Sequence, residues 1–172
     1  MKFLEKNLEQ IIFESDKRAL EKRGLGIYGK LLRQLKIGNY GISDLVEIRK
    51  PWYSEEDKKH YKGEIIVYEL KQESISFYTL SQAIGYLKGI RTFLERKGID
   101  NYFNYRIILI GAELDLYSSF CYLPDFFTFY NNYELDINEC SQFGIDLCKY
   151  NYDFDGIKFE FISDYNLRDK GF

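Results

Sequence analysis

The sequence predicts an α/β domain in which a central mixed sheet is flanked by helices. Two observations support this: the predicted elements follow the order helix, strand pair, strand, helix, strand, and the last of these strands, Tyr105–Ala112, is apolar on both faces. A chain of 172 residues is long enough to bury a sizeable core and lies in the single-domain range. We therefore expect one domain over residues 1–172, with a core at about 3–112 and an extension at about 113–172.

The first part of the chain predicts a helix followed by two paired strands. A helix from about residue 3 to Arg23, ended by Gly24 and Gly26, is indicated by residues at helical spacing: Leu4, Leu8, Ile11, Ile12, Ser15 and Ala19. Strands are expected at Leu31–Ile37 and Ile42–Ile48, with a hairpin turn at 38–41 between them and Pro51 after the second. The polar stretch 53–62 is typical of a surface loop.

The next elements predict a crossover connection. A strand is expected at Glu64–Lys71, a helix at Phe77–Lys97 ended by Gly98, and then the strand Tyr105–Ala112. Near the C-terminus, residues 153–156 look like a hairpin turn between strands at about 145–152 and 157–162, which would extend the sheet or form its edge. Residues 117–143 predict no definite element.

Composition and charge exclude several classes. No apolar stretch is long enough for a membrane span and no signal peptide is recognisable, so a cytoplasmic protein without membrane contact is expected. Three cysteines, Cys121, Cys140 and Cys148, are too widely spaced for a zinc or iron-sulfur signature, and His60 has no metal-binding partner nearby. Residues 1–100 hold 19 Lys and Arg against 15 Asp and Glu, whereas 101–172 hold 5 against 12. An anionic partner should therefore bind the first part, with a chance uneven scatter of solvated surface charge as the alternative.

Charged residues interrupt the apolar faces of two predicted strands. Side chains alternate across a strand, so Glu69 and Lys71 share a face with Ile65 and Val67. In the same way Asp44 lies on the face of Ile42, Val46 and Ile48. A buried carboxylate costs several kcal/mol, roughly, unless it is paired or binds a metal. The pattern indicates a metal-dependent active site, with a buried structural ion pair as the alternative.

Four motifs follow one another in order along the chain. These are Glu9 on the first helix, Asp44 on a strand after Gly41, Glu69-x-Lys71 on the next strand, and Gln82-x-x-x-Tyr86 on the following helix. Together they resemble the PD-(D/E)XK nucleases, and the Gln-x-x-x-Tyr element resembles the RecB-like branch. Ser43 stands where the superfamily name implies proline, and the upstream histidine and the four-cysteine cluster of some relatives are missing.

The resemblance implies a restriction-endonuclease-like fold, with an α-β-β-β-α-β core and here an extra C-terminal hairpin. Asp44, Glu69, the Leu70 carbonyl and Glu9 would hold Mg²⁺ or Mn²⁺, which prefer oxygen ligands. Lys71 would position or deprotonate the attacking water, and Gln82 and Tyr86 would contact the same phosphate or its nucleotide. Basic residues of the first hundred would frame this site and bind nucleic acid: Lys30, Arg33, Lys36, Lys88 and Arg91.

The function that this resemblance implies is a metal-dependent deoxyribonuclease, an endonuclease that acts on DNA, with a homodimer or a partner protein as a further possibility. One alternative is an inactive nucleic-acid-binding or assembly module on the same fold. Another is a structural partner protein that binds through residues 113–172. At individual positions, Glu9 has the alternative of an exposed helical carboxylate, with Glu5 or Glu14 as substitutes, and Gln82 and Tyr86 have the alternative of ordinary helix residues.

Overall fold

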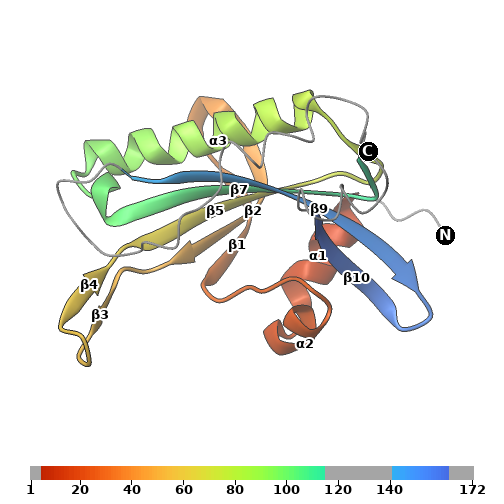
Figure 1. The fold of residues 1–172 in the computed structure, drawn as a ribbon. Helices are drawn as coiled ribbons and strands as arrows, with labels where there is room; N and C mark the ends of the chain where they lie inside the picture. The colour runs from red at the N-terminus through yellow and green to blue at the C-terminus, as the bar shows by residue number, and fades with distance from the viewer. Residues whose placement is uncertain (1–4, 115–140, 163–172) are drawn as a thin grey trace, which may run out of the picture.

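A computed structural model describes residues 5–114 and 141–162 of the chain. Its centre is a mixed six-stranded sheet with the order β1-β2-β5-β7-β9-β10. Helix α3 covers one face of this sheet, and the short helices α1 and α2 lie on the other (Figure 1). The α/β class predicted from the sequence is therefore confirmed, and the predicted element order is present in the described residues.

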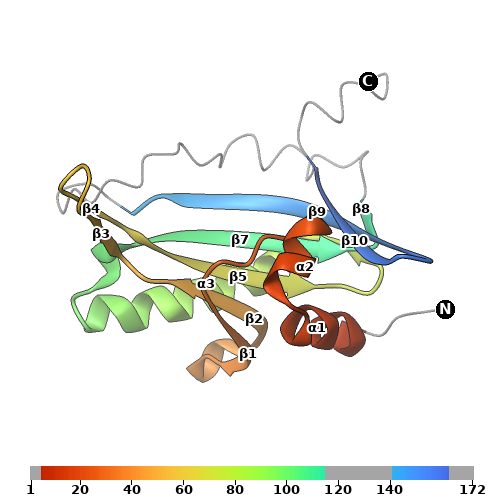
Figure 2. The ribbon, with the colours of Figure 1, turned by 90° about the horizontal axis from the view of Figure 1, so that it is seen from below.

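The N-terminal helix is shorter than expected and is broken into two. Helix α1 spans Glu5–Glu14 and α2 spans Lys17–Lys22. The break has a local cause, because Asp16 caps α2: its carboxylate accepts hydrogen bonds from the backbone N–H groups of Arg18 and Ala19. Helix α2 ends as predicted before Gly24, which has φ +96°. Figure 2 shows both helices in front of the sheet in a view from below.

Strands β1 (Lys30–Lys36), β2 (Ile42–Arg49) and β5 (Gly63–Leu70) are antiparallel neighbours and lie close to their predicted bounds. The connection between β1 and β2 contains a 3-10 turn, η1 (Gly38–Tyr40). The stretch expected to be a loop instead forms a small hairpin of β3 (Trp52–Ser54) and β4 (Lys59–Tyr61). Cross-strand ring pairs stabilise it, with Trp52 stacked on Tyr61 at a centroid distance of 4.3 Å.

The predicted crossover is confirmed. Helix α3 (Phe77–Arg96) follows β5 and leads through η2 (Asp100–Tyr102) to β7 (Phe103–Gly111), which pairs parallel with β5. Ser76 and Thr79 form a capping box that starts α3. A second small sheet joins β6 (Ser74–Ile75) and β8 (Glu113–Leu114) in parallel.

The C-terminal hairpin extends the sheet, as expected. Strand β9 (Phe143–Asp153) pairs parallel with β7, and β10 (Gly156–Ile162) returns antiparallel as the edge. Gly156 has φ +105°, which suits the tight turn. Cys148 is buried on β9. Cys121, Cys140 and most of the stretch without a predicted element lie outside the described residues.

Two cores sandwich the sheet. Under α3 they include Val46, Val67 and Leu109, and under α1 and α2 they include Leu45, Tyr68 and Ile108. Strand β5 is buried along its whole length. In the part of the chain that the structure covers, no helix is long and apolar enough to cross a membrane.

Candidate active site

Asp44 and Glu69 lie opposite each other on neighbouring strands. The pairing of β2 with β5 ends at this side with Leu45 beside Tyr68, and one further step of the antiparallel register places Asp44 beside Glu69. Alternation puts both on the face of Val46 and Val67, which is the face under α3. The predicted convergence of the two carboxylates on one face therefore agrees with the register.

The hydrogen bonding of the β5 backbone also changes beside Asp44. The N–H of Leu70 donates to the Asp44 carboxylate, with 2.9 Å between N and Oδ2, while the next N–H, of Lys71, donates to the Ile110 carbonyl of β7. A side chain thus replaces a β2 carbonyl as the acceptor for Leu70. Because N–H and C=O of one strand residue point to the same side, the Leu70 carbonyl is directed toward Asp44 as well.

Lys71 forms an ion pair with Glu69. Its Nζ lies 3.1 Å from Glu69 Oε1 and 3.8 Å from Glu5 Oε1 at the start of α1. Glu69 is only 3% exposed, and its second oxygen, Oε2, is buried without a hydrogen-bond partner in the structure. One oxygen of the buried carboxylate is therefore paired and the other is available to a ligand.

Burial dominates the protonation of the two acids. Burial and then the Asp44 charge raise the pKa of Glu69 to about 7, although Lys71 opposes this. Burial also raises the pKa of Asp44 above its usual range, against the Leu70 hydrogen bond and Lys71, which lower it. Two partly desolvated carboxylates side by side are a site that a cation would stabilise.

Lys71 keeps its proton. Burial lowers the pKa of Lys71, but Glu69, Glu5 and Asp44 together raise it further, and the net result is a pKa above the ordinary value. An ammonium ion donates hydrogen bonds and stabilises negative charge but accepts no proton. Of the two roles considered for Lys71, positioning a water fits this environment better than deprotonating it.

Glu9 is buried, at 3% exposure, so the alternative of an exposed helical carboxylate is wrong. Its carboxylate accepts hydrogen bonds from Arg33 Nε and Gln34 Nε2 on β1. Glu5 and Glu14 on the same helix are exposed. Beside Glu9 lies an open pocket of about 750 Å³, lined by Glu5, Lys6, Glu9, Arg33, Gln34, Asp44 and Gln72.

Tyr86 of α3 lies near the acid pair. It is 8% exposed, and burial, followed by the charges of Glu69 and Asp44, raises the pKa of its hydroxyl. Its ring also covers Gly41, where an added Cβ would stand 3.0 Å from Tyr86 Cε1. Gln82, one helical turn earlier, has a buried side-chain oxygen, Oε1, without a hydrogen-bond partner in the structure. Both residues of the motif thus differ from ordinary exposed helix positions.

Of the basic residues predicted to bind nucleic acid, some lie near the pocket and others lie further along the strands. Arg33 lines the pocket, and Lys36 follows Gln34 by two residues on β1. Lys30 pairs in register with Ile48, about 13 Å along β1 from Gln34. Arg91 bonds to Glu95 and covers the ring of Tyr105, which pairs with Ile65, also about 13 Å from Glu69 along β5. Lys88 is exposed on α3.

The available oxygen donors fit a hard cation that takes only a few of its ligands from the protein and the rest from water. Two carboxylates and a strand carbonyl are oxygen donors, and Mg²⁺ commonly binds through one or two carboxylates and keeps several waters. The unpartnered Glu69 Oε2 supports this fit. Within residues 5–114 and 141–162, however, no group of three or more His, Cys, Asp or Glu side chains has the arrangement of a complete metal site. Glu9 is tied to Arg33 and Gln34 rather than to Asp44.

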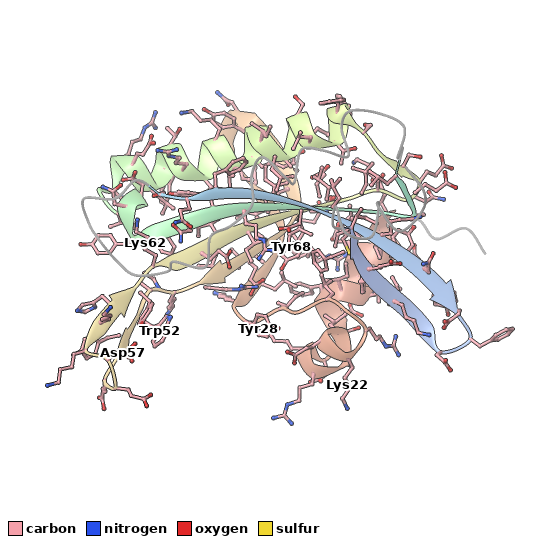
Figure 3. The ribbon with its side chains drawn as sticks, viewed as in Figure 1. Lys22, Tyr28, Trp52, Asp57, Lys62 and Tyr68 are labelled. Carbon is pink, nitrogen blue, oxygen red and sulfur yellow. The ribbon has the colours of Figure 1, made fainter. Side chains whose placement is uncertain are left out.

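A second charged cluster, on the opposite face, has no counterpart in the sequence prediction. Glu47, fully buried, accepts hydrogen bonds from Tyr68 Oη at 2.7 Å, from Arg49 Nε at 2.8 Å and from the N–H of Tyr28 at 2.7 Å. Arg49 also bonds to Glu64, at 2.6 Å. Figure 3 shows Tyr28 and Tyr68 on the side of the sheet that carries α1 and α2. The sequence signal that could have predicted this cluster was Glu47 and Arg49, two residues apart and therefore on the same face of β2.

Comparison with known proteins adds no relative, since no family model, no curated protein and no solved structure matches this chain.

Proposed function

We propose that this chain is a metal-dependent nuclease that hydrolyses phosphodiester bonds of DNA, as an endonuclease, on a restriction-endonuclease-like fold of the PD-(D/E)XK superfamily. The observation that carries the proposal is the pair Asp44 and Glu69, opposed on adjacent strands, with Lys71 bonded to Glu69 and Leu70 bonded to Asp44. The order of α1, the antiparallel strands β1, β2 and β5, and the α3 crossover to β7 supports the fold assignment.

Each residue has a role that follows from its surroundings. Asp44, Glu69 and the Leu70 carbonyl would hold Mg²⁺ or Mn²⁺, which supplies a polarised water and neutralises charge on the phosphate. The Lys71 ammonium, from its place beside Glu69, would orient that water. Tyr86 on α3 lies close enough to feel the charges of both acids, and Gln82, one turn earlier, has an unpartnered side-chain oxygen. Both would contact the scissile phosphate or its nucleotide.

The buried acid pair costs folding free energy unless a ligand compensates its charge. Glu69 is buried with one unpartnered oxygen and a neighbouring carboxylate, both of which raise its free energy in the ionised form. Natural proteins retain such costs mainly at functional sites. A bound cation would remove the repulsion and fill the free position.

The second candidate is an inactive nucleic-acid-binding or assembly module on the same fold. It is favoured by the absence, among the described residues, of a complete group of three metal-ligating side chains, and by the Lys71–Glu69 ion pair, which already compensates one buried charge. In this case Asp44, Glu69 and Lys71 would be structural.

Cleavage and metal binding distinguish the two candidates. Supercoiled plasmid, linear duplex DNA and single-stranded RNA are incubated with the protein in Mg²⁺, Mn²⁺ or chelator, and divalent-ion binding is measured by calorimetry. The nuclease proposal expects nicking or linearisation of circular DNA that stops with chelator. Folded protein that cuts neither DNA nor RNA and binds neither metal would support the binding module instead.

A further inference from the structure

Strand β1 changes the direction of its side chains in its middle. Leu32 and Leu35 both pack against the core under α3, although they are three positions apart and a regular strand would place them on opposite faces. The register shows where the change occurs. Arg33 pairs with Leu45 and Leu35 with Ser43, while the position between them, Gln34 opposite Asp44, is not paired. The register is the same on both sides of Gln34, so no residue is inserted, and β1 is kinked at this one position.

Gln34 has an unusual backbone conformation for this position. Its φ is +51°, in the left-handed region that favours glycine. In the described part of the chain the only other non-glycine residue with positive φ is Lys58, at +55°, which lies in the turn of the β3–β4 hairpin. A left-handed residue is common in a turn but is strained inside a strand.

The kink at Gln34 directs two consecutive side chains to one acceptor. Arg33 and Gln34 both donate to the Glu9 carboxylate, one to each oxygen. Regular alternation would send one of them to the opposite face. As a result Glu9 is held on the wall of the pocket that Asp44 also lines, and the charge of Glu9 is felt at Asp44.

We propose that Gln34 is a positioning residue: its left-handed backbone, together with Arg33, fixes the Glu9 carboxylate beside Asp44 so that Glu9 adds to the affinity of the site for a divalent cation. This rests on the proposed function. Each carboxylate oxygen has a second lone pair, so Glu9 can still face a cation or its bound water while Arg33 and Gln34 hold it.

Mn²⁺ binding to the intact chain, measured by calorimetry, tests the proposal without any need for turnover. Gln34→Ala and Gln34→Gly both remove the amide, and each should weaken Mn²⁺ binding about tenfold or more, as expected for a residue that orients a ligand. Gly tolerates positive φ, so Gln34→Gly should melt at a higher temperature than Gln34→Ala. Gln34 is exposed, and both variants should fold.

Two further variants make the test specific. Lys58→Gly relieves the other left-handed residue, far from the pocket, and should leave Mn²⁺ affinity unchanged. Glu9→Gln should weaken binding, and adding Gln34→Ala to it should cause little further loss, because Gln34 acts through Glu9. Wild-type Mn²⁺ affinity in Gln34→Gly would mean that Gln34 has only a structural role and would overturn the inference while leaving the proposed function intact. A wild-type protein that binds no divalent cation would overturn both.

Discussion

The carboxylate of Asp44 accepts a hydrogen bond from the backbone N–H of Leu70, 2.9 Å away, at the point where β2 and β5 stop pairing. Asp44 therefore has a structural role as well as its proposed metal-binding role. The bond fixes one carboxylate oxygen against β5, next to Glu69. It also leaves the second oxygen directed away from that bond, where a shared cation would bind.

The two roles of Asp44 can be separated by substitution. Asp44→Asn keeps an oxygen acceptor for the Leu70 N–H but loses the charge, whereas Asp44→Ala loses both. We expect both variants to lose cleavage and Mg²⁺ affinity, and we expect only Asp44→Ala to lose stability, by about 1 kcal/mol. Calorimetry and urea unfolding measure the two effects. Asp44→Ala with unaltered Mg²⁺ binding would remove Asp44 from the ligand set.

Lys71→Ala should have a different signature. It removes the ammonium that orients water, so cleavage should be lost, but it also removes a like charge beside the metal, so Mg²⁺ affinity should be unchanged or higher. Circular dichroism checks that the variant is folded. Substantial cleavage by folded Lys71→Ala would mean that another group positions the water.

Glu69 should make stability fall with rising pH in metal-free buffer. Its pKa is raised from 4.5 to about 7, so the folded chain binds this proton more tightly than the unfolded chain, and ionising Glu69 costs stability as pH rises through that interval. Glu69→Gln avoids the cost. At pH 8 with chelator it should be more stable than wild type by up to about 3 kcal/mol, and at pH 4 the difference should vanish. Urea unfolding across this pH range measures it, and parallel profiles would contradict the assignment.

The structural acid Glu47 should show the opposite dependence. Burial raises its pKa, but Arg49, Tyr68 and the Gly29 N–H lower it more, so the net shift is downward. Its contribution is complete above the unfolded pKa and is lost as pH falls through the folded one. Glu47→Gln should cost about 2 kcal/mol at pH 7, and the cost should shrink below about pH 4. Because Glu47 lies on the other face, Mg²⁺ affinity should not change.

Much of the sheet could be predicted because its signals are local. The alternation of apolar residues predicted strands β2 and β5 and placed Asp44 and Glu69 on their inner faces. Gly98 and Gly156, both with positive φ, correctly marked the end of α3 and the turn of the C-terminal hairpin. The break between α1 and α2 also had a signal, the N-cap residue Asp16, but apolar spacing continued across it and outweighed it. In the β3–β4 hairpin the aromatic pairs were hidden by the charged turn between them.

The parts that could not be predicted depend on contacts between distant residues. No local pattern marks Gln34 as left-handed, since its conformation follows from Glu9, 25 residues earlier, and from the packing of Leu35. The Glu47, Arg49 and Glu64 cluster needs the β2–β5 register before its charges can be matched. Burial of Glu9 rather than Glu5 or Glu14 depended on which side of α1 meets the sheet.

The path of bound nucleic acid over the protein can be tested by the salt dependence of binding and by two alanine variants, one at Lys36 and one at Arg91. Contacts to phosphates release counterions, so DNA affinity should fall with salt, with a slope of about 0.9 per phosphate contacted. Lys36 is exposed about 7 Å along β1 from Gln34, whereas Arg91 is bonded to Glu95 and lies beside Tyr105, toward the other end of β5. Lys36→Ala should therefore weaken DNA binding and reduce the slope by about 1, and Arg91→Ala should change it less. Fluorescence anisotropy in chelator, over a range of salt, measures both without cleavage. If Arg91→Ala has the larger effect, the DNA runs along α3 instead of crossing the β1 edge beside the pocket; if salt has no effect, binding does not depend on phosphate contacts.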